Sequence, residues 1–268
     1  MPVGSNGGQA VFSLEDKVAV VTGGTSGIGE AVCRRFAAAG AKVVVAGRRD
    51  ATAFADELGG LYVRTDVSDE EQVKALMAAA AGLTGHIDVC VNNAGAMGEG
   101  EIVGTTVELM DRMYRVNTLG VFLGMKHAVG YMRRGAAIVN TASIASVIGA
   151  PGIAAYAASK TAVLGLTRVA AMEFGPLGIR VNCICPATVK TPMWAAQENA
   201  EDEAAVSVLT APLGRCIEPE EAAALIHFLA ADDCAIVSGQ EIIIDGGARA
   251  GFSEAFWNSA CQMVEPRP

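Results

Sequence analysis

A tyrosine and a lysine spaced four positions apart, Tyr156 and Lys160, are the side chains whose types and spacing most directly suggest chemistry. If the segment is helical, this spacing puts both side chains on one face. A phenol with an ordinary pKa of about 10 is a poor base at neutral pH, but a neighbouring ammonium group favours its phenolate form. The pair therefore predicts a tyrosine that works as a general acid or base.

A third candidate, Ser143, follows an apolar run at residues 136–142 that is typical of a buried strand. Parallel strands of an α/β sheet present ligand sites at their carboxyl ends, so the serine hydroxyl could hold a substrate oxygen there. Taken alone each signal is weak, because Tyr-x-x-x-Lys also occurs by chance and most serines are surface residues.

A glycine-rich turn at residues 22–29, Thr-Gly-Gly-Thr-Ser-Gly-Ile-Gly, lies between a short β-branched run and an amphipathic stretch. Gly23, Gly27 and Gly29 permit a tight turn, bring backbone N–H groups close to an anion and let a helix pack against the strand. Because the helix dipole also favours a pyrophosphate, the turn predicts a dinucleotide site. The alternative is a glycine turn that serves packing alone.

The second predicted strand ends in Gly47-Arg48-Arg49, at the place where an acidic residue would bind a free ribose 2′-hydroxyl. A guanidinium instead forms charge-assisted hydrogen bonds to a 2′-phosphate. Arg48 therefore favours NADP(H), with NAD(H) as the other possibility. The alternative interpretation is that both arginines only solvate a loop.

Alternating strand and helix patterns predict the elements that position these residues. Strands are expected at residues 17–21, 42–46, 61–64, 87–92, 136–142, 179–184 and 241–244, and helices at 28–39, 52–58, 70–81, 107–132, 155–174 and 219–230. Without a linker or a repeat, this order predicts an α/β protein: a single-domain Rossmann fold whose doubly wound seven-stranded parallel sheet has helices on both faces.

The composition excludes several classes of protein. The 268-residue chain is 51% hydrophobic and 18% charged, which argues against disorder as its main state. Its 20 basic and 29 acidic residues give a net charge of −9, so neither nucleic acid nor an anionic membrane is expected as a partner. Seven cysteines without a C-x-x-C pair and three histidines without metal spacing indicate reduced thiols in a cytoplasmic protein that has no metal site.

The two ends of the chain differ in composition from its centre. Residues 1–13 lack the basic start and the long apolar core of a signal peptide, so a flexible arm is expected, followed by the folded domain at 14–248. The uncharged residues 135–159 contain too many turn-forming residues for a spanning helix. Residues 249–268 form a tail with Phe252, Phe256 and Trp257, which either covers an active site or a neighbouring subunit, or frays.

Taken together, these motifs resemble those of the classical short-chain dehydrogenases/reductases over nearly the whole chain, from about residue 14 to residue 247. The combination is highly specific. It comprises the T-G-x-x-x-G-x-G turn, Asp66-Val67, Asn92-Asn93-Ala94-Gly95, Asn117, Ser143, Tyr156, Lys160, Pro186, Thr191 and Asp245-Gly246-Gly247.

The resemblance implies reversible hydride transfer between a nicotinamide and a ketone or secondary alcohol. Tyr156 would transfer the hydroxyl proton, and Ser143 would orient the carbonyl. Lys160 would bind the nicotinamide ribose and lower the pKa of Tyr156, and Asn117 would hold a water of a proton relay. Asp66 would bond the adenine, Val67 would flank it, and Asn93 would stabilise the sheet centre. With Arg48, the expected cofactor-binding residues are Gly23, Thr25, Ser26, Gly27, Ile28, Gly29, Asp66, Val67, Asn93, Ala94, Gly95, Tyr156, Lys160, Pro186, Thr188, Val189 and Thr191.

The resemblance also implies a nearly apolar substrate pocket, which suits a hydrophobic substrate, with a cyclic one as an option. Its expected residues are Met97, Ile144, Ala145, Ile153, Ala187, Met193 and Trp194, although such residues are also common in cores. Residues 191–213 resemble the family's mobile substrate lid. One departure is Pro186-Ala187, where the family usually has Pro-Gly, which puts the substrate position in doubt.

Other functions stay open at this point. An NAD(H)-dependent secondary-alcohol dehydrogenase is the nearest alternative, followed by a catalytically silent cofactor-sensing regulator. An acyl-carrier-protein-linked ketoreductase is disfavoured because an acidic carrier would prefer a basic docking surface. The family is usually tetrameric through its long helices, here residues 107–132 and 155–174, so a homotetramer or homodimer is expected.

Overall fold

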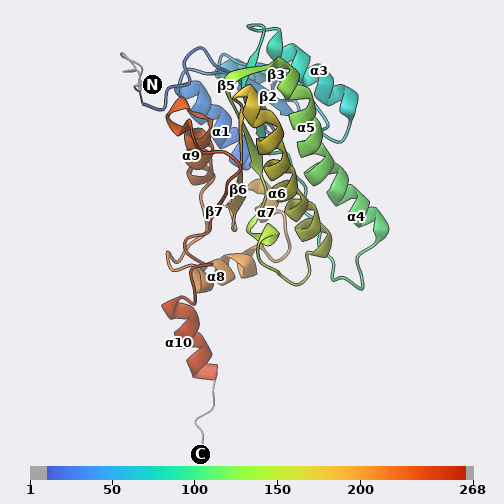
Figure 1. Ribbon diagram of the computed structural model, residues 1–268. Coiled ribbons are helices and arrows are strands. Elements are labelled where there is room, and N and C mark those ends of the chain that lie inside the picture. Colours follow the sequence, from blue (N-terminus) through green and yellow to red (C-terminus); the bar gives the residue numbers. More distant parts are fainter. Residues whose placement is uncertain (1–10, 264–268) are drawn as a thin grey trace, which may run out of the picture.

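The computed structural model describes residues 11–263 and has a seven-stranded sheet at its centre (Figure 1). All neighbouring strands are parallel, in the order β3-β2-β1-β4-β5-β6-β7. The strands are β1 (Val18–Thr22), β2 (Lys42–Gly47), β3 (Leu61–Arg64), β4 (Ile87–Asn92), β5 (Met132–Thr141), β6 (Arg180–Pro186) and β7 (Glu241–Ile244). The predicted doubly wound parallel sheet is confirmed.

Helices cover both faces of this sheet (Figure 1). On one face α1 (Gly27–Ala38) packs against α9 (Pro219–Ala230), and the short α2 (Thr52–Glu57) contributes to the same apolar cluster. On the other face lie α3 (Glu70–Ala81), α5 (Gly120–Ala128) and α6 (Ala154–Phe174). The sheet therefore separates two apolar cores, as expected for this class of fold.

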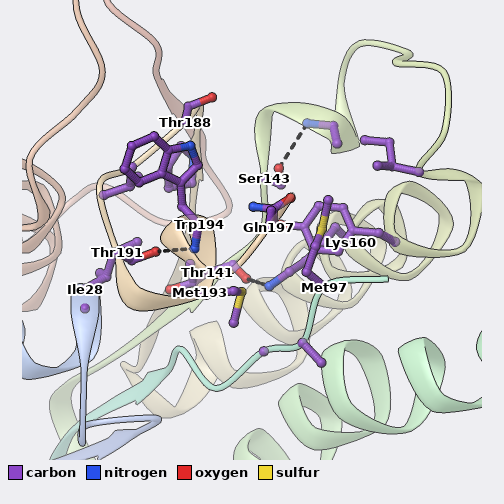
Figure 2. Close-up of a pocket in the computed structure, with 18 of the residues that line it drawn as sticks. Ile28, Met97, Thr141, Ser143, Lys160, Thr188, Thr191, Met193, Trp194 and Gln197 are labelled. Atoms are coloured by element: carbon purple, nitrogen blue, oxygen red, sulfur yellow. Dashed lines mark hydrogen bonds between the residues drawn. The ribbon is translucent and has the colours of Figure 1, made fainter. Parts of the chain in front are cut away.

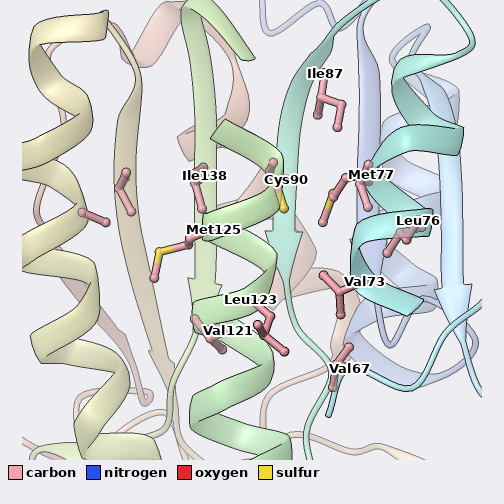
Figure 3. Packing of buried hydrophobic residues seen from close by; sticks show 14 of the residues in the cluster. Val67, Val73, Leu76, Met77, Ile87, Cys90, Val121, Leu123, Met125 and Ile138 are labelled. Atoms are coloured by element: carbon pink, nitrogen blue, oxygen red, sulfur yellow. The ribbon is translucent and has the colours of Figure 1, made fainter. Parts of the chain in front are cut away.

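Burial on both faces explains the sequences of the central strands. Every residue of β1, Val-Ala-Val-Val-Thr, is buried, so the strand has no polar alternation. Figure 3 shows one of the two cores, where Leu76 of α3 and Leu123 of α5 face Cys90 of β4 and Ile138 of β5.

The strand order reverses at β1, which pairs with β2 on one side and with β4 on the other. The connections that leave the two sides of β1 diverge, and this opens a crevice at the carboxyl ends of the strands. The glycine turn follows β1 at this point.

The predicted helix over residues 107–132 is wrong as a single element. The segment divides into α4 (Val107–Met113), a π-helical turn (Tyr114–Leu119), α5 and a 3₁₀ turn (Val129–Tyr131), and Met132 already begins β5. Met132 pairs with Ile87 of β4, and the register shifts before Val89. Backbone pairing with β4 therefore overrides the local helical pattern at the end of the segment. Similarly, β6 continues to Pro186, two positions beyond the predicted end.

Two helices follow β6 beyond the carboxyl ends of the strands, α7 (Pro192–Ala195) and α8 (Ala200–Thr210). The tail forms α10 (Glu254–Met263), which projects from the body, contacts α8 and buries none of its residues (Figure 1). No helix within residues 11–263 is long and apolar enough to cross a membrane.

The predicted N-terminal arm lies mostly outside the described residues, which begin at residue 11. Its described end is attached to the domain, since the Phe12 carbonyl accepts a hydrogen bond from His227 Nε2 of α9 at 2.8 Å.

Candidate active site

A cavity of about 1000 Å³ lies at the carboxyl ends of the strands. The turns that follow β1 to β6 line it, together with parts of α6, α7 and α8. It collects nearly all of the predicted site residues, and the two exceptions are Gly29 and Asn117.

The glycine turn shapes one end of this cavity. Gly27 has a φ of +56°, and a Cβ there would lie 2.9 Å from Thr191 Cγ2. Gly29 does not line the cavity, because it packs under the turn; a Cβ there would overlap the carbonyl oxygen of Gly23. Glycine at these positions keeps the backbone of the turn close to both the sheet and the cavity.

The start of α1 offers hydrogen-bond donors to an anion. Ser26 is the N-cap residue, has an extended backbone and makes no capping hydrogen bond with its side chain. The first N–H groups of a helix have no partners within the helix, and its dipole attracts negative charge. Ser26, Gly27 and Ile28 line the cavity at this point, so these residues fit a dinucleotide pyrophosphate.

Two arginines at the end of β2 line the same end of the cavity. Arg48 and Arg49 are both exposed, and neither makes a hydrogen bond or ion pair with another residue in the described range. Asp66 and Val67 follow β3 and line the cavity beside them. One carboxylate oxygen of Asp66 accepts hydrogen bonds from the backbone and hydroxyl of Ser68, so this loop is held by its own side chains.

The loop after β4 is fixed to the glycine turn. Asn93 Nδ2 donates to the Thr22 carbonyl at 3.2 Å, and Thr22 Oγ1 accepts from the backbone N–H groups of Asn93 and Ala94. These contacts agree with the stabilising role predicted for Asn93. They hold Ala94 and Gly95 at the wall of the cavity.

Asn117 lies in the π-helical turn and is fully buried. Its Oδ1 accepts from the Ala96 N–H at 2.8 Å, and its Nδ2 donates to the Ala96 carbonyl at 2.9 Å and to Ser159 Oγ at 3.0 Å. The side chain thus joins the β4 loop to α6 and does not reach the cavity. The predicted contact of Asn117 with a relay water remains a prediction.

Lys160 and Tyr156 project from one face of α6, as their spacing predicts, and both line the cavity. Lys160 is buried, and its Nζ donates to the Thr141 carbonyl at 2.8 Å (Figure 2). Burial disfavours the ammonium form and lowers the pKa of Lys160 to about 8. Nearby, Thr141 Oγ1 is buried without a partner among the described residues, which leaves a polar atom available to a ligand.

Burial raises the pKa of Tyr156 above its ordinary value. The Ser143 hydroxyl acts in the opposite direction, and the carboxylate of Glu203 adds to the increase. Lys160 is not among the causes, so the expected lowering of the Tyr156 pKa by Lys160 stays a prediction for the cofactor-bound state. Ser143 Oγ accepts a hydrogen bond from the Ala145 N–H at 3.2 Å, which fixes the hydroxyl at the end of β5 (Figure 2).

The predicted substrate residues line the other end of the cavity: Met97, Ile144, Ala145, Ile153, Ala187, Met193 and Trp194. Ala187 replaces the usual glycine without backbone strain, since its φ is not positive. Its N–H donates a hydrogen bond to the Ile244 carbonyl at 2.9 Å. The alanine is therefore compatible with the turn beside Pro186.

Sequence reasoning missed a set of polar residues in this end of the cavity. Glu99 lies in the loop after β4, and Gln197 follows α7. The others repeat at helical spacing along α8 and its N-cap, together with the apolar Val206: Asn199, Asp202, Glu203, Ser207 and Thr210. A period of three to four residues was visible in the segment, so assigning a helix to the lid would have revealed this face.

Comparisons with known proteins agree with the fold. The model of a family described as "Enoyl-(Acyl carrier protein) reductase" matches residues 23–249. A mitochondrial borneol dehydrogenase of Lavandula x intermedia is 38% identical, over 94% of this chain and 95% of that protein. A trans-4-hydroxycyclohexanecarboxylate dehydrogenase of Sinomonas cyclohexanicum is also 38% identical, over 89% of this chain and 95% of that protein.

A solved structure, a short-chain type dehydrogenase/reductase from Mycobacterium marinum, superposes with a TM-score of 0.83 at 33% identity. The alignment covers 90% of this chain and 98% of that chain. The chain belongs to the short-chain dehydrogenase/reductase family and is an NAD(P)-dependent oxidoreductase.

Proposed function

We propose that this enzyme interconverts a ketone and a secondary alcohol with an apolar, cyclic body, and that it prefers NADP(H). The observation that carries the proposal is the convergence of Ser143, Tyr156 and Lys160 in one cavity with the open N-terminus of α1. Borneol and 4-hydroxycyclohexanecarboxylate, named for two relatives, are both cyclic secondary alcohols.

Tyr156 and Ser143 have different roles at the substrate oxygen. Tyr156 exchanges a proton with this oxygen, and Ser143 Oγ holds it by a hydrogen bond. Within residues 11–263 the Lys160 ammonium has one acceptor, the Thr141 carbonyl, so it retains donors for the nicotinamide ribose. The bound nicotinamide supplies or accepts the hydride.

The crevice at β1 would hold the cofactor at two places. The N–H groups at the start of α1 would bind the pyrophosphate, and Asp66 and Val67, which line the cavity beside Arg48, would bind the adenine. Arg48 supports the preference for NADP(H), because its guanidinium lines the cavity without a protein partner in residues 11–263 and can bind a 2′-phosphate.

Reduction of cyclohexanone with NADPH and with NADH tests this function. We expect wild type to favour NADPH, and Arg48→Ala to lower kcat/KM for NADPH about 10- to 100-fold, as loss of a charge-assisted hydrogen bond implies, with little change for NADH. Arg64→Ala is the matched control, because Arg64 is exposed at the end of β3 but does not line the cavity. An unchanged NADPH/NADH ratio in Arg48→Ala would show that the arginine only solvates its loop, and a wild type that favours NADH would indicate an NAD(H)-dependent enzyme.

We also propose that the enzyme assembles as a homodimer or homotetramer. Val107 and Met110 of α4 and Val169 and Met172 of α6 are exposed, and these two helices contact each other. An exposed apolar face of this kind suits burial between copies of the chain.

A further inference from the structure

The charges that line the cavity are unevenly distributed. Arg48 and Arg49 lie at the end where β2 terminates, whereas Glu99, Asp202 and Glu203 come from the loop after β4 and from α8. Lys160 is the only basic residue of the catalytic group, and no histidine lines the cavity among the described residues. The substrate end therefore carries three carboxylates without an arginine to neutralise them.

Glu203 is the carboxylate nearest to the chemistry. Its residue is partly buried on α8, and its carboxylate takes part in no hydrogen bond or ion pair with residues 11–263. Its charge acts on Tyr156 of α6, and the charge of Glu99 acts on Glu203 in turn. Burial and Glu99 together raise the pKa of Glu203. Two separate elements, the loop after β4 and α8, thus bring acidic groups toward the catalytic tyrosine.

The uncharged polar atoms nearby add a second acceptor. Gln197 Oε1 is buried and has no hydrogen-bond partner among the described residues, and the same is true of one donor, Trp194 Nε1. Figure 2 shows Gln197 projecting toward Ser143, whereas the ring of Trp194 extends toward Thr188, and both residues line the cavity. A buried polar atom without a partner costs free energy, which a ligand hydroxyl can recover because it both donates and accepts.

We infer that Glu203, assisted by Glu99, is a specificity-determining residue that excludes anionic substrates and favours those with a second, hydrogen-bond-donating hydroxyl. The inference rests on the proposed function, since it assigns the substrate class of the same Tyr156 site. A substrate carboxylate would bring a like charge into a partly desolvated space, whereas a hydroxyl would supply the hydrogen that Glu203 and Gln197 can accept.

Three cyclic alcohols that differ at one ring position test the inference: cyclohexanol, trans-1,4-cyclohexanediol and trans-4-hydroxycyclohexanecarboxylate. We expect kcat/KM of wild type with NADP⁺ to be highest for the diol and lowest for the carboxylate. In Glu203→Gln, kcat/KM for the carboxylate relative to cyclohexanol should rise about tenfold, the size expected when one nearby charge is removed from a partly solvated site. Glu99→Gln, on another element, should change the ratio in the same direction by a smaller factor.

The matched control is Glu201→Gln, which makes the same change on the same helix at a residue that is exposed and does not line the cavity. It should leave the ratio as in wild type. If wild type prefers the carboxylate, or if Glu203→Gln and Glu201→Gln give the same ratio, the inference is overturned while the proposed function stands.

Calorimetric binding of the same three compounds to the NADP⁺-loaded protein separates this inference from the function itself. If no alcohol is oxidised, the proposed function fails. The charge selectivity still holds in that case if the affinities follow the expected order and differ less from one another in Glu203→Gln. If none of the three compounds binds, both are wrong.

Discussion

At the residue scale, the buried ammonium group of Lys160 carries a free-energy cost that a bound ligand can reduce. The side chain is 4% exposed, and one carbonyl oxygen is its hydrogen-bond acceptor among the described residues. A buried ammonium group with one acceptor is poorly solvated, which is why its pKa falls to about 8. The lysine is therefore better suited to a cofactor-bound site than to the empty one.

The pKa of Lys160 predicts how stability depends on pH. The pKa is about 8 in the folded protein, against 10.5 as its ordinary value, so the cost of burying the charge is complete below pH 8 and is relieved as the pH rises. At neutral pH, we expect Lys160→Met to have a higher free energy of unfolding than wild type. This difference should shrink by about 3 kcal/mol when the pH is raised above the ordinary pKa of lysine. Urea unfolding of both proteins without cofactor measures this, and a difference that is independent of pH would contradict it.

At the scale of elements, a buried polar network holds the catalytic helix against the sheet. Asn92 Nδ2 of β4 donates to Asn140 Oδ1 of β5, and Asn140 Nδ2 donates to Thr167 Oγ1 of α6, both at 2.9 Å. All three residues are buried, so each hydrogen bond lies in a region of low dielectric constant. The network sets the position of the helix that carries Tyr156 and Lys160.

Removing the centre of this network tests its role. We expect Asn140→Ala to lower the free energy of unfolding by about 2–4 kcal/mol, because it leaves Asn92 Nδ2 buried without its acceptor and removes a donor from Thr167 Oγ1, which keeps only its bond to the Val163 carbonyl among the described residues. Asn258→Ala on the exposed face of α10 is the matched control and should change stability by less than about 0.5 kcal/mol. Urea unfolding distinguishes the two, and equal effects would show that the network contributes nothing specific.

The same scale shows where sequence reasoning succeeds. The turn after β1 and the Tyr156–Lys160 pair were predictable, because short-range backbone geometry and helical spacing determine them. The division of residues 107–132 was not, since pairing of Met132 with Ile87 is a contact between distant parts of the chain. The cavity-lining face that includes Glu203 was missed because no helix was predicted in the lid, and its position relative to Tyr156 depends on where α8 lies relative to α6, which no local pattern contains.

At the scale of the whole molecule, two apolar surfaces differ in their relation to the fold. The face formed by α4 and α6 belongs to the domain, whereas α10 projects from it and packs only lightly on α8 (Figure 1). The stacked rings of Phe252 and Phe256, 5.1 Å apart, stabilise the start of this helix without joining it to a core. The proposed assembly through α4 and α6 would therefore require no contribution from the tail.

This difference predicts the behaviour of two variants in solution. We expect Met172→Glu to lower the mass of the assembly, because it places a charge in the proposed apolar interface. A chain that ends at Ser253 should form an assembly with as many subunits as wild type. Its free energy of unfolding should fall by no more than about 1 kcal/mol, since α10 buries none of its residues. Light scattering during size-exclusion chromatography measures the mass. A monomer in the truncated chain, with Met172→Glu unaffected, would assign assembly to the tail instead.

The central claim is that Tyr156 exchanges the proton of the substrate oxygen, and the most direct test compares turnover with cofactor binding in Tyr156→Phe. The variant keeps the ring and removes the hydroxyl, so kcat for cyclohexanone reduction should fall by about 10²–10⁴-fold. The affinity for NADPH, measured from nucleotide fluorescence, should stay within about threefold of wild type, because the glycine turn and Arg48 are untouched. Full turnover in a folded Tyr156→Phe variant would contradict the account.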